Sequence, residues 1–135
     1  MGIIFEGGAN HNVVRKCYIQ NISREGAVTF RAGIATDYNY ILSSIISDSA
    51  VGVLCQDTNN GNNTIANCTI INNSDTGIKI SGKYGPTFRN NIIYQKSSNG
   101  PCIKISGPNA DISYNSNYSN YYHESGQIAN FKESG

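Results

Sequence analysis

The stretch Gly77-Ile78-Lys79-Ile80-Ser81-Gly82 decides the fold, because versions of it recur at a fixed interval along the chain. A small residue opens each copy and falls at the evenly spaced positions 2, 27, 52, 77 and 102. Two apolar columns follow it. They are Ile3, Val28, Val53, Ile78 and Ile103, and then Phe5, Phe30, Cys55, Ile80 and Ile105. Self-similarity at a fixed period predicts a solenoid, in which each repeat buries its apolar face against its neighbours.

A second motif lies between these copies. It consists of an apolar residue, a small residue three positions later and, in most copies, an apolar residue two positions after that. The copies begin at Val14, Ile41, Ile65 and Phe88, and their small residues are Cys17, Ser44, Cys68 and Asn91. A weaker copy reads Ile112, Asn115 and Asn117. The spacing predicts two short strands separated by a bend in each coil.

A polar residue stands two positions after each closing isoleucine of the second motif. The column consists of Asn21, Asp48, Asn72 and Gln95. We interpret it as a ladder at a turn, in which amide side chains bond the backbone and each other from coil to coil. Asn and Asp also tolerate the left-handed backbone that such turns need. The alternative is a row of amides that bind a ligand.

Composition limits the classes of function. The chain has 135 residues, which suits one domain with a moderate core. Its net charge is +1 and charged residues make up 14%, so no strong field favours nucleic acid or an acidic membrane surface. No apolar run approaches the roughly 20 residues of a membrane span, and no signal-peptide pattern precedes the first strand. We therefore expect neither nucleic acid nor membrane as a partner.

The four cysteines can be placed by the repeat. Cys17 and Cys68 are equivalent and lie two coils apart, whereas Cys55 and Cys102 fall in different columns. Because stacked strands are about 4.8 Å apart, residues two coils apart are separated by roughly 10 Å, too far for a disulfide. We expect four free thiols that act mostly as small core residues. No CxxC or Cys/His spacing indicates a metal, so no cofactor is expected.

The two motifs resemble those of the right-handed parallel β-helix superfamily, the pectate-lyase-like group, in their Gly-Ile-x-Ile and Asn-Cys-x-Ile repeats. These are Gly77–Ile80 and Asn67–Ile70 here. The resemblance covers about residues 2–119 and implies an all-β, single-stranded parallel solenoid. The constant spacing of the repeat indicates that this solenoid has about five coils. We place the coils in residues 1–119 and an irregular C-terminal cap of the same domain in residues 120–135, with Ile128 and Phe131 folding over the last coil.

The resemblance is specific for the fold and not for the activity. Its members include polysaccharide lyases, glycoside hydrolases, uronate epimerases, phage tailspikes and proteins without a known reaction, and they are often secreted. Most of its enzymes have about twice as many coils and a helix that caps the N-terminal end. No such helix is expected here, and an open solenoid end exposes strand edges that proteins avoid. We therefore expect a homo-oligomer through the uncapped N-terminal coil, with a fragment of a longer protein as the alternative.

The loops that follow the first strands should line up along one edge of the solenoid. They are residues 6–12, 31–39, 56–63, 81–87 and 106–110. Long loops on a rigid scaffold collect binding residues, and tyrosines suit sugar rings. We therefore predict substrate contacts from His11, Tyr38, Tyr40, Lys83 and Tyr84. The alternative is that these are solvated turns whose tyrosines cover strand edges.

The outward positions of the first strands form a further column: Ile4, Thr29, Leu54, Lys79 and Lys104. Lys79 and Lys104 should lie about 4.8 Å apart on neighbouring strands, as a mildly unfavourable like-charge pair. Such a pair could receive an acidic sugar or another anion. Two solvated lysines are the alternative.

Enzymes of the resembled superfamily use clustered carboxylates, either as calcium ligands beside an arginine base or as an acid/base pair. The nine acidic residues here are dispersed. The set that comes closest to such a cluster is Asp37 as acid/base, Asp57 as its partner and Arg31 as a clamp on a substrate carboxylate. Calcium would be a cofactor only if the protein were a polysaccharide lyase. Three functions therefore stay open: carbohydrate binding along the loop edge, a polysaccharide lyase or glycoside hydrolase, and a structural or assembly role without catalysis.

Overall fold

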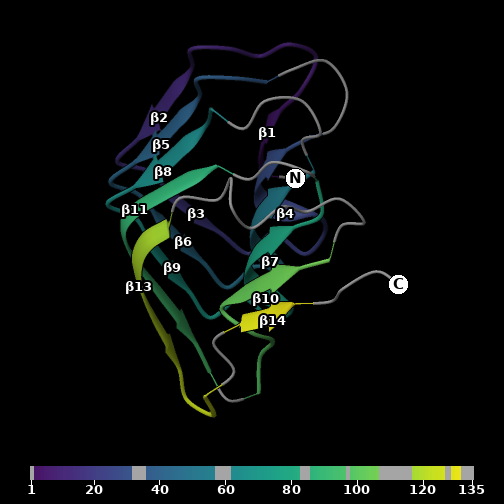
Figure 1. Ribbon diagram of the computed structural model, residues 1–135, viewed down its shortest axis with the longest axis vertical. Coiled ribbons are helices and arrows are strands. Elements are labelled where there is room, and N and C mark those ends of the chain that lie inside the picture. Colours follow the sequence, from purple (N-terminus) through teal and green to yellow (C-terminus); the bar gives the residue numbers. More distant parts are fainter. Residues whose placement is uncertain are drawn as a thin grey trace.

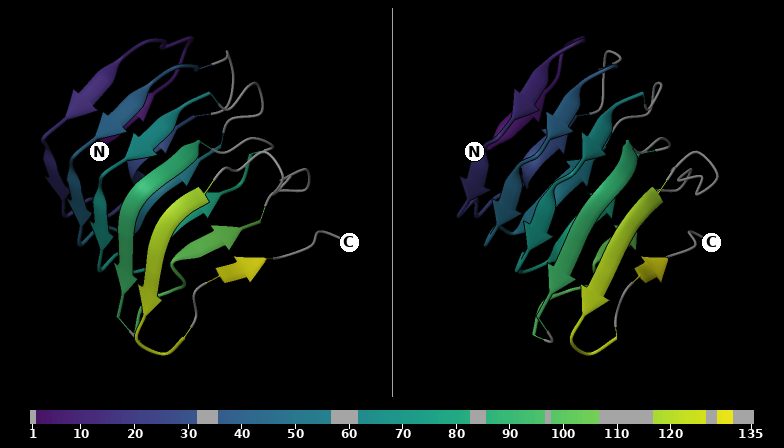
Figure 2. Two further views of the ribbon diagram at one scale, coloured as in Figure 1. Left: turned by 60° about the vertical axis from the view of Figure 1, so that its left-hand side comes forward. Right: turned by 90° about the vertical axis from the view of Figure 1, so that its left-hand side faces the viewer.

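The structure is a computed structural model that describes residues 2–31, 36–56, 62–82, 86–96, 98–106, 117–126 and 129–131. The chain winds through short strands that stack in parallel into two sheets (Figure 1). Successive coils lie side by side along one axis, with the N-terminal coil at one end and the last strands at the other (Figure 2). The predicted all-β solenoid is confirmed.

The first sheet contains the strands that carry the evenly spaced repeat. Its order is β1 (Ile3–Phe5), β4 (Gly26–Phe30), β7 (Val51–Cys55), β10 (Thr76–Ile80), β12 (Ile103–Ile105) and β14 (Ala129–Phe131). Ile3 pairs with Val28, Val28 with Val53, Val53 with Ile78 and Ile78 with Ile103. Every pairing is parallel, so both predicted columns are confirmed in register.

The second sheet contains the strands of the second motif. Its order is β2 (Val13–Arg15), β5 (Tyr40–Leu42), β8 (Thr64–Ala66), β11 (Thr87–Gln95), β9 (Thr69–Ile71), β6 (Ile45–Ser47) and β3 (Tyr18–Gln20), while β13 (Asn117–His123) also pairs with β11. The predicted bend separates the two strands in three coils, where Lys16, Ser43 and Asn67 have positive φ. In the fourth coil β11 runs through the bend, although Asn90 keeps a φ of 51°.

The core lies between the two sheets and is built from columns of equivalent side chains. Phe5 stacks on Phe30 with ring centroids 5.1 Å apart. Opposite them are buried columns of Ile41, Ile65 and Phe88, and of Ile46, Ile70 and Ile93. Because a strand this short cannot bury a face alone, each coil depends on its neighbours for its core.

The small residue that opens each repeat lies where the two sheets approach closely. A Cβ on Gly77 would lie 2.8 Å from the carbonyl oxygen of Cys102 and 2.8 Å from Cγ2 of Ile93. A Cβ on Gly52 would lie 2.7 Å from Cγ2 of Ile70. These distances are shorter than ordinary van der Waals contacts, which explains the preference for small residues in this column.

Three of the four members of the polar column differ from the prediction by one residue, whereas Gln95 belongs to the ladder as predicted. Asn21, Asp48 and Asn72 adopt the expected left-handed backbone, with φ of 58°, 48° and 55°. The coil-to-coil ladder, however, consists of hydrogen bonds from Ile22 N to Ser49 Oγ, from Ser49 N to Asn73 Oδ1 and from Asn73 N to Gln95 Oε1. A left-handed residue breaks the alternation of the strand, so the following residue turns inward and the side chains of Asn21, Asp48 and Asn72 face outward.

The strands continue past residue 119, where the coils were expected to end. β13 pairs with β11 and β14 pairs with β12, so the boundary expected between coils and cap falls inside β13. The predicted match of Asn117 to Ile93 is wrong, because Asn117 pairs with Phe88 and Tyr121 pairs with Ile93. This coil is longer than the others, so the spacing of the earlier copies misplaces it. Ile128 lies outside the described residues.

The four cysteines are thiols and form no disulfide, as predicted. Cys55, Cys68 and Cys102 are buried and Cys17 is half-buried. Burial raises the pKa of the Cys68 thiol and of the Cys102 thiol, because the thiolate would lose its hydration. The described residues include no helix long and apolar enough to cross a membrane.

Candidate functional site

The loop edge presents two aromatic side chains from neighbouring coils. His11 and Tyr38 hold equivalent positions just before β2 and β5, because Val13 pairs with Tyr40. Their rings stack with centroids 5.1 Å apart and an interplanar angle of 16°. Both residues are exposed, and Tyr38 has 46% of its surface accessible. We call this pair the aromatic ledge. The predicted proximity of His11 to the second loop is confirmed.

The ledge is held by the backbone beneath it. His11 and Tyr38 have φ of 58° and 54°, so both side chains leave the same kind of bend. His11 N donates to the carbonyl oxygen of Asp37, and Asp37 N donates to Oδ1 of Asn10 at 2.6 Å. These bonds join the two loops at the point from which the rings project.

A ladder of amides lies directly behind the ledge, with Asn12 exposed and Asn39 and Asn63 buried. Asn39 Oδ1 accepts from the backbone N and from Nδ2 of Asn12, and Asn63 Oδ1 accepts from the same two atoms of Asn39. Asn63 Nδ2 in turn donates to the carbonyl oxygen of Thr36. Each amide therefore satisfies backbone groups that would otherwise be buried without partners. Pro86 follows Asn63 at the equivalent position of the next coil and ends the ladder, because it has no amide side chain.

This amide column could have been found in the sequence. The step from Asn12 to Asn39 equals the step from Val14 to Ile41 in the second motif. The step from Asn39 to Asn63 likewise equals the step from Ile41 to Ile65. Aligning the second motif therefore aligns the amides. The abundance of Asn elsewhere in the chain conceals the signal.

The other predicted contacts of the loop edge differ in position. Tyr40 lies in β5 on the outer face of the second sheet and is half-buried. Lys83, Tyr84 and Asp57 lie outside the described residues. The structure therefore brings together His11, Tyr38 and the backbone of Asp37 from the predicted set.

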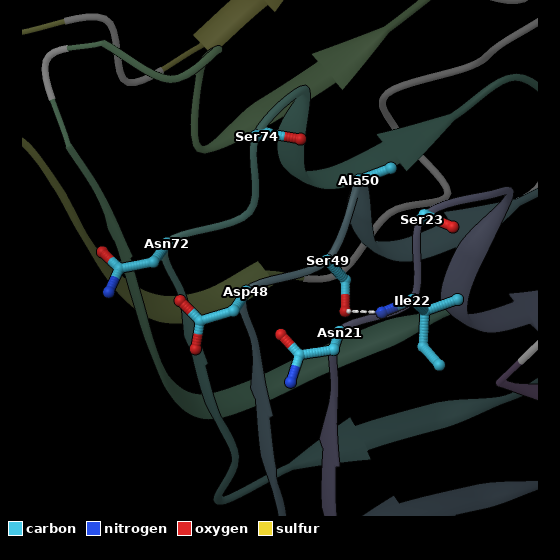
Figure 3. Close-up of a pocket in the computed structure, with 8 residues that line it drawn as sticks. All are labelled: Asn21, Ile22, Ser23, Asp48, Ser49, Ala50, Asn72 and Ser74. Carbon is cyan, nitrogen blue, oxygen red and sulfur yellow. Dashed lines mark hydrogen bonds between the residues drawn. The ribbon is translucent and has the colours of Figure 1, made fainter.

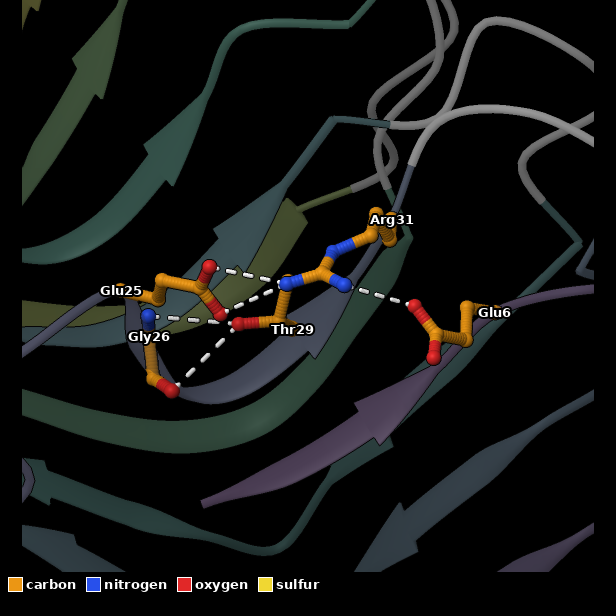
Figure 4. A network of polar contacts seen from close by, with 5 residues as sticks. All are labelled: Glu6, Glu25, Gly26, Thr29 and Arg31. Atoms are coloured by element: carbon orange, nitrogen blue, oxygen red, sulfur yellow. Dashed lines mark hydrogen bonds and ion pairs between the residues drawn. The ribbon is translucent and has the colours of Figure 1, made fainter. Parts of the chain in front are cut away.

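Arg31, the predicted clamp on a substrate carboxylate, is held by two carboxylates of the chain. Its Nη1 lies 2.7 Å from Oε2 of Glu6, and its Nη2 lies 2.8 Å and 2.9 Å from the two carboxylate oxygens of Glu25. Figure 4 shows the guanidinium between the two acids, above Thr29. The hydrogen bond to Glu6, and next the charge of Glu25, raise the pKa of Arg31. A substrate carboxylate would have to displace these partners.

Asp37 is half-buried beside the ledge. Its Oδ1 is buried and has no hydrogen-bond partner among the described residues. A general acid or base must reach the atom with which it exchanges a proton. Its predicted partner Asp57 lies outside the described residues.

Lys79 and Lys104 share an acidic partner, which the prediction of a like-charge pair did not include. They are neighbours on β10 and β12, as predicted. Asp75 places Oδ2 3.7 Å from the Nζ atom of Lys79 and Oδ1 3.9 Å from the Nζ atom of Lys104. The shared carboxylate offsets the repulsion and lowers the attraction of this surface for an anion.

A shallow groove lies at the bend that joins the second sheet to the first. It has a volume of about 500 Å³ and is lined by Asn21, Ile22, Ser23, Asp48, Ser49, Ala50, Asn72 and Ser74. Figure 3 shows the side chains of Asn21, Asp48 and Asn72 in a row, with Ser23, Ala50 and Ser74 in a second row. We call this feature the corner groove. It is the outward face of the column that the sequence predicted as a ladder.

Within the described part of the chain, no group of three or more His, Cys, Asp or Glu side chains could hold a metal ion. The protein-family model described as "Right handed beta helix region" matches residues 1–133. No curated protein and no solved structure matches the chain in the corresponding searches.

Proposed function

The chain belongs to the right-handed β-helix family, and on this premise we propose that it binds carbohydrate along the edge that carries the aromatic ledge. The stacked and exposed pair of His11 and Tyr38 is the observation that supports this function. An aromatic ring that is already fixed loses little freedom when a sugar packs on it, so less of the binding energy is lost to ordering. The amide ladder behind the ledge supplies this rigidity.

The alternative of a polysaccharide lyase or glycoside hydrolase has weaker support. Arg31 is engaged by Glu6 and Glu25, and one oxygen of Asp37 is buried. A pair of carboxylates at a defined separation is the usual requirement for glycoside hydrolysis. Substitution of Asp37 by Asn should abolish turnover in an enzyme and leave binding nearly unchanged in a binding module.

A structural role through self-association is supported by a different observation. Strands β1, β2 and β3 lie at one end of the described strand order, and each pairs with one neighbouring strand. A second copy of the chain could pair with these edges, since open edges template association. Light scattering at high protein concentration tests this role, and a monomer at every concentration would exclude it.

The carbohydrate function is tested by a thermal-shift screen against neutral and acidic polysaccharides, with and without calcium. A ligand that binds only the folded state raises the melting temperature. The substitution Tyr38→Ala should remove the rise. Tyr18→Ala is a matched control, because Tyr18 is 60% exposed and lies in β3, away from the ledge. If Tyr38→Ala retains the full rise, the glycan does not bind at the ledge.

A further inference from the structure

The corner groove is built from two rows of equivalent residues on three neighbouring coils. Asn21, Asp48 and Asn72 form one wall, and Ser23, Ala50 and Ser74 form the other. Because strands in a sheet are about 4.8 Å apart, the three coils extend the groove over roughly 10 Å along the solenoid axis. The groove is therefore elongated, with polar groups repeating at the spacing of the coils.

The outer wall carries a polar atom that the described residues leave without a partner. Oδ1 of Asn72 is buried and has no hydrogen-bond partner among them. The hydrogen bond drawn in Figure 3 joins Ile22 N to Ser49 Oγ, which belongs to the ladder beneath the groove. A buried acceptor without a donor costs free energy, and a bound donor recovers it. Because this oxygen is buried, the Asn72 side chain would have to rotate toward the groove before the oxygen could accept from a ligand hydroxyl.

The charge of the groove restricts the ligand. Among the described residues that line the groove, Asp48 is the acidic one and none is Lys, Arg or His. An acidic sugar would bring its carboxylate beside that of Asp48 without a cation in the lining to offset the repulsion. A neutral sugar instead offers hydroxyls that donate to the carboxylate and exchange hydrogen bonds with the flanking amides.

Apolar atoms in the same lining suit the C–H face of a sugar ring. The methyl group of Ala50 lies between Ser23 and Ser74 in the second row, and Ile22 contributes its side chain at one end. Small-molecule sites usually combine a mostly apolar lining with a few polar groups. This lining is richer in polar groups, which suits a ligand that carries many hydroxyls.

The walls are also held in place. The bonds from Ile22 N to Ser49 Oγ and from Ser49 N to Asn73 Oδ1 are both 3.1 Å long and run beneath the groove. Asn21, Asp48 and Asn72 share a left-handed backbone conformation, which fixes the direction in which their side chains project. A ligand therefore meets preformed rows.

We propose that the corner groove is a binding site for a neutral, hydroxyl-rich glycan, with Asp48 as the central acceptor and Asn21 and Asn72 on either side. The site is separate from the aromatic ledge and does not depend on it. A divalent cation is the competing occupant, since the same oxygens could coordinate calcium. A single carboxylate makes this a weak cation site, because calcium affinity depends on the number of charged ligands.

The experiment is a titration followed by two-dimensional amide NMR, for which a chain of 14.6 kDa is well suited. The probes are cellohexaose, mannohexaose and N-acetylchitohexaose as neutral glycans, hexagalacturonate as the acidic glycan, and calcium chloride alone. We expect at least one neutral hexasaccharide to shift the amides of residues 21–23, 48–50 and 72–74. Hexagalacturonate and calcium should leave these amides in place.

The substitution Asp48→Asn tests the role of the carboxylate. Asn tolerates the left-handed backbone, so the variant keeps the bend while losing the charge. Loss of a charge-assisted hydrogen bond should weaken binding about tenfold. Glu6→Gln is the control, since it removes the same charge from the residue that follows β1, away from the corner groove. Tyr38→Ala should leave these shifts unchanged, so failure at the ledge and failure at the groove can be distinguished.

Three results would overturn the proposal. The first is that no neutral probe moves the corner amides. The second is that hexagalacturonate or calcium alone moves them as strongly as a neutral glycan does. The third is that Asp48→Asn, with an amide spectrum showing an intact fold, binds as tightly as the parent protein.

Discussion

Asn63 accepts two hydrogen bonds from Asn39, the equivalent residue of the preceding coil, through a single side-chain oxygen. The backbone N and Nδ2 of Asn39 both lie 3.0 Å from Oδ1 of Asn63. Asn39 is fully buried and repeats the same pair of bonds with Asn12. This relationship fixes the spacing of the coils at the bend from which the aromatic ledge projects.

The ladder should make Asn39 one of the most sensitive polar positions. Substitution by Ala leaves the carbonyl oxygen of Ala9 without its side-chain donor and removes one of the two donors to Oδ1 of Asn63. It also removes the acceptor of the backbone N and of Nδ2 of Asn12. We expect a loss of about 2–5 kcal/mol in the free energy of unfolding, measured by urea denaturation. Asn62→Ala is the control, because Asn62 is exposed and adjacent to the ladder. Equal losses in the two variants would show that the hydrogen bonds of the ladder do not contribute specifically to the free energy of unfolding.

The close approach of the sheets predicts intolerance of side chains at Gly77. A Cβ there would lie 2.8 Å from Ile93 Cγ2 and from a backbone oxygen, so Gly77→Val must displace a neighbouring coil. The expected cost is about 1–3 kcal/mol in the free energy of unfolding, from overpacking. Ser98→Ala, on an exposed turn, serves as the control. A variant as stable as the parent would mean that the two sheets can separate locally at little cost.

Burial of the thiols predicts the order in which they react. Native protein treated with a thiol reagent at pH 8 should be modified first at Cys17, while Cys55, Cys68 and Cys102 react only as the protein unfolds. Rapid modification of a second thiol would contradict the packing of these columns.

A dependence of stability on pH follows from the raised pKa values of Cys68 and Cys102. A thiol in the unfolded chain ionises at lower pH than the same thiol buried in the fold. Below the ordinary pKa of a thiol, both states are protonated and these groups do not lower the free energy of unfolding. Stability is then lost as the pH rises through the folded values. We expect urea midpoints to fall between pH 8 and pH 10, and to fall less in Cys68→Ser. An equal fall in both proteins would assign the effect to other groups.

The ion pairs of Arg31 should contribute little to stability, because they are exposed. Substitution of Arg31 by Gln should change the melting temperature by no more than about 2 °C, and added salt should reduce even this difference. The same variant should keep its affinity for any glycan held at the ledge. A large loss of affinity for an acidic glycan, with a normal melting temperature, would restore Arg31 as a ligand-binding residue.

The repeat by itself determined the fold. Its constant spacing placed Ile3, Val28, Val53, Ile78 and Ile103 in one column, and the structure pairs them in that register. It also placed the cysteines at separations that exclude disulfides. These features follow from the sequence because stacking identical positions is the only way in which such short strands bury their apolar side chains.

Tertiary structure decided which polar side chains face a neighbour and which face solvent. The left-handed residues at Asn21, Asp48 and Asn72 moved the ladder one position onward and turned their own side chains into the corner groove. Glu25 and Glu6 engage Arg31, and Asp75 lies between Lys79 and Lys104. A single bend changes the direction of every side chain near it, and the periodicity of the sequence carries no information about backbone angles at a turn.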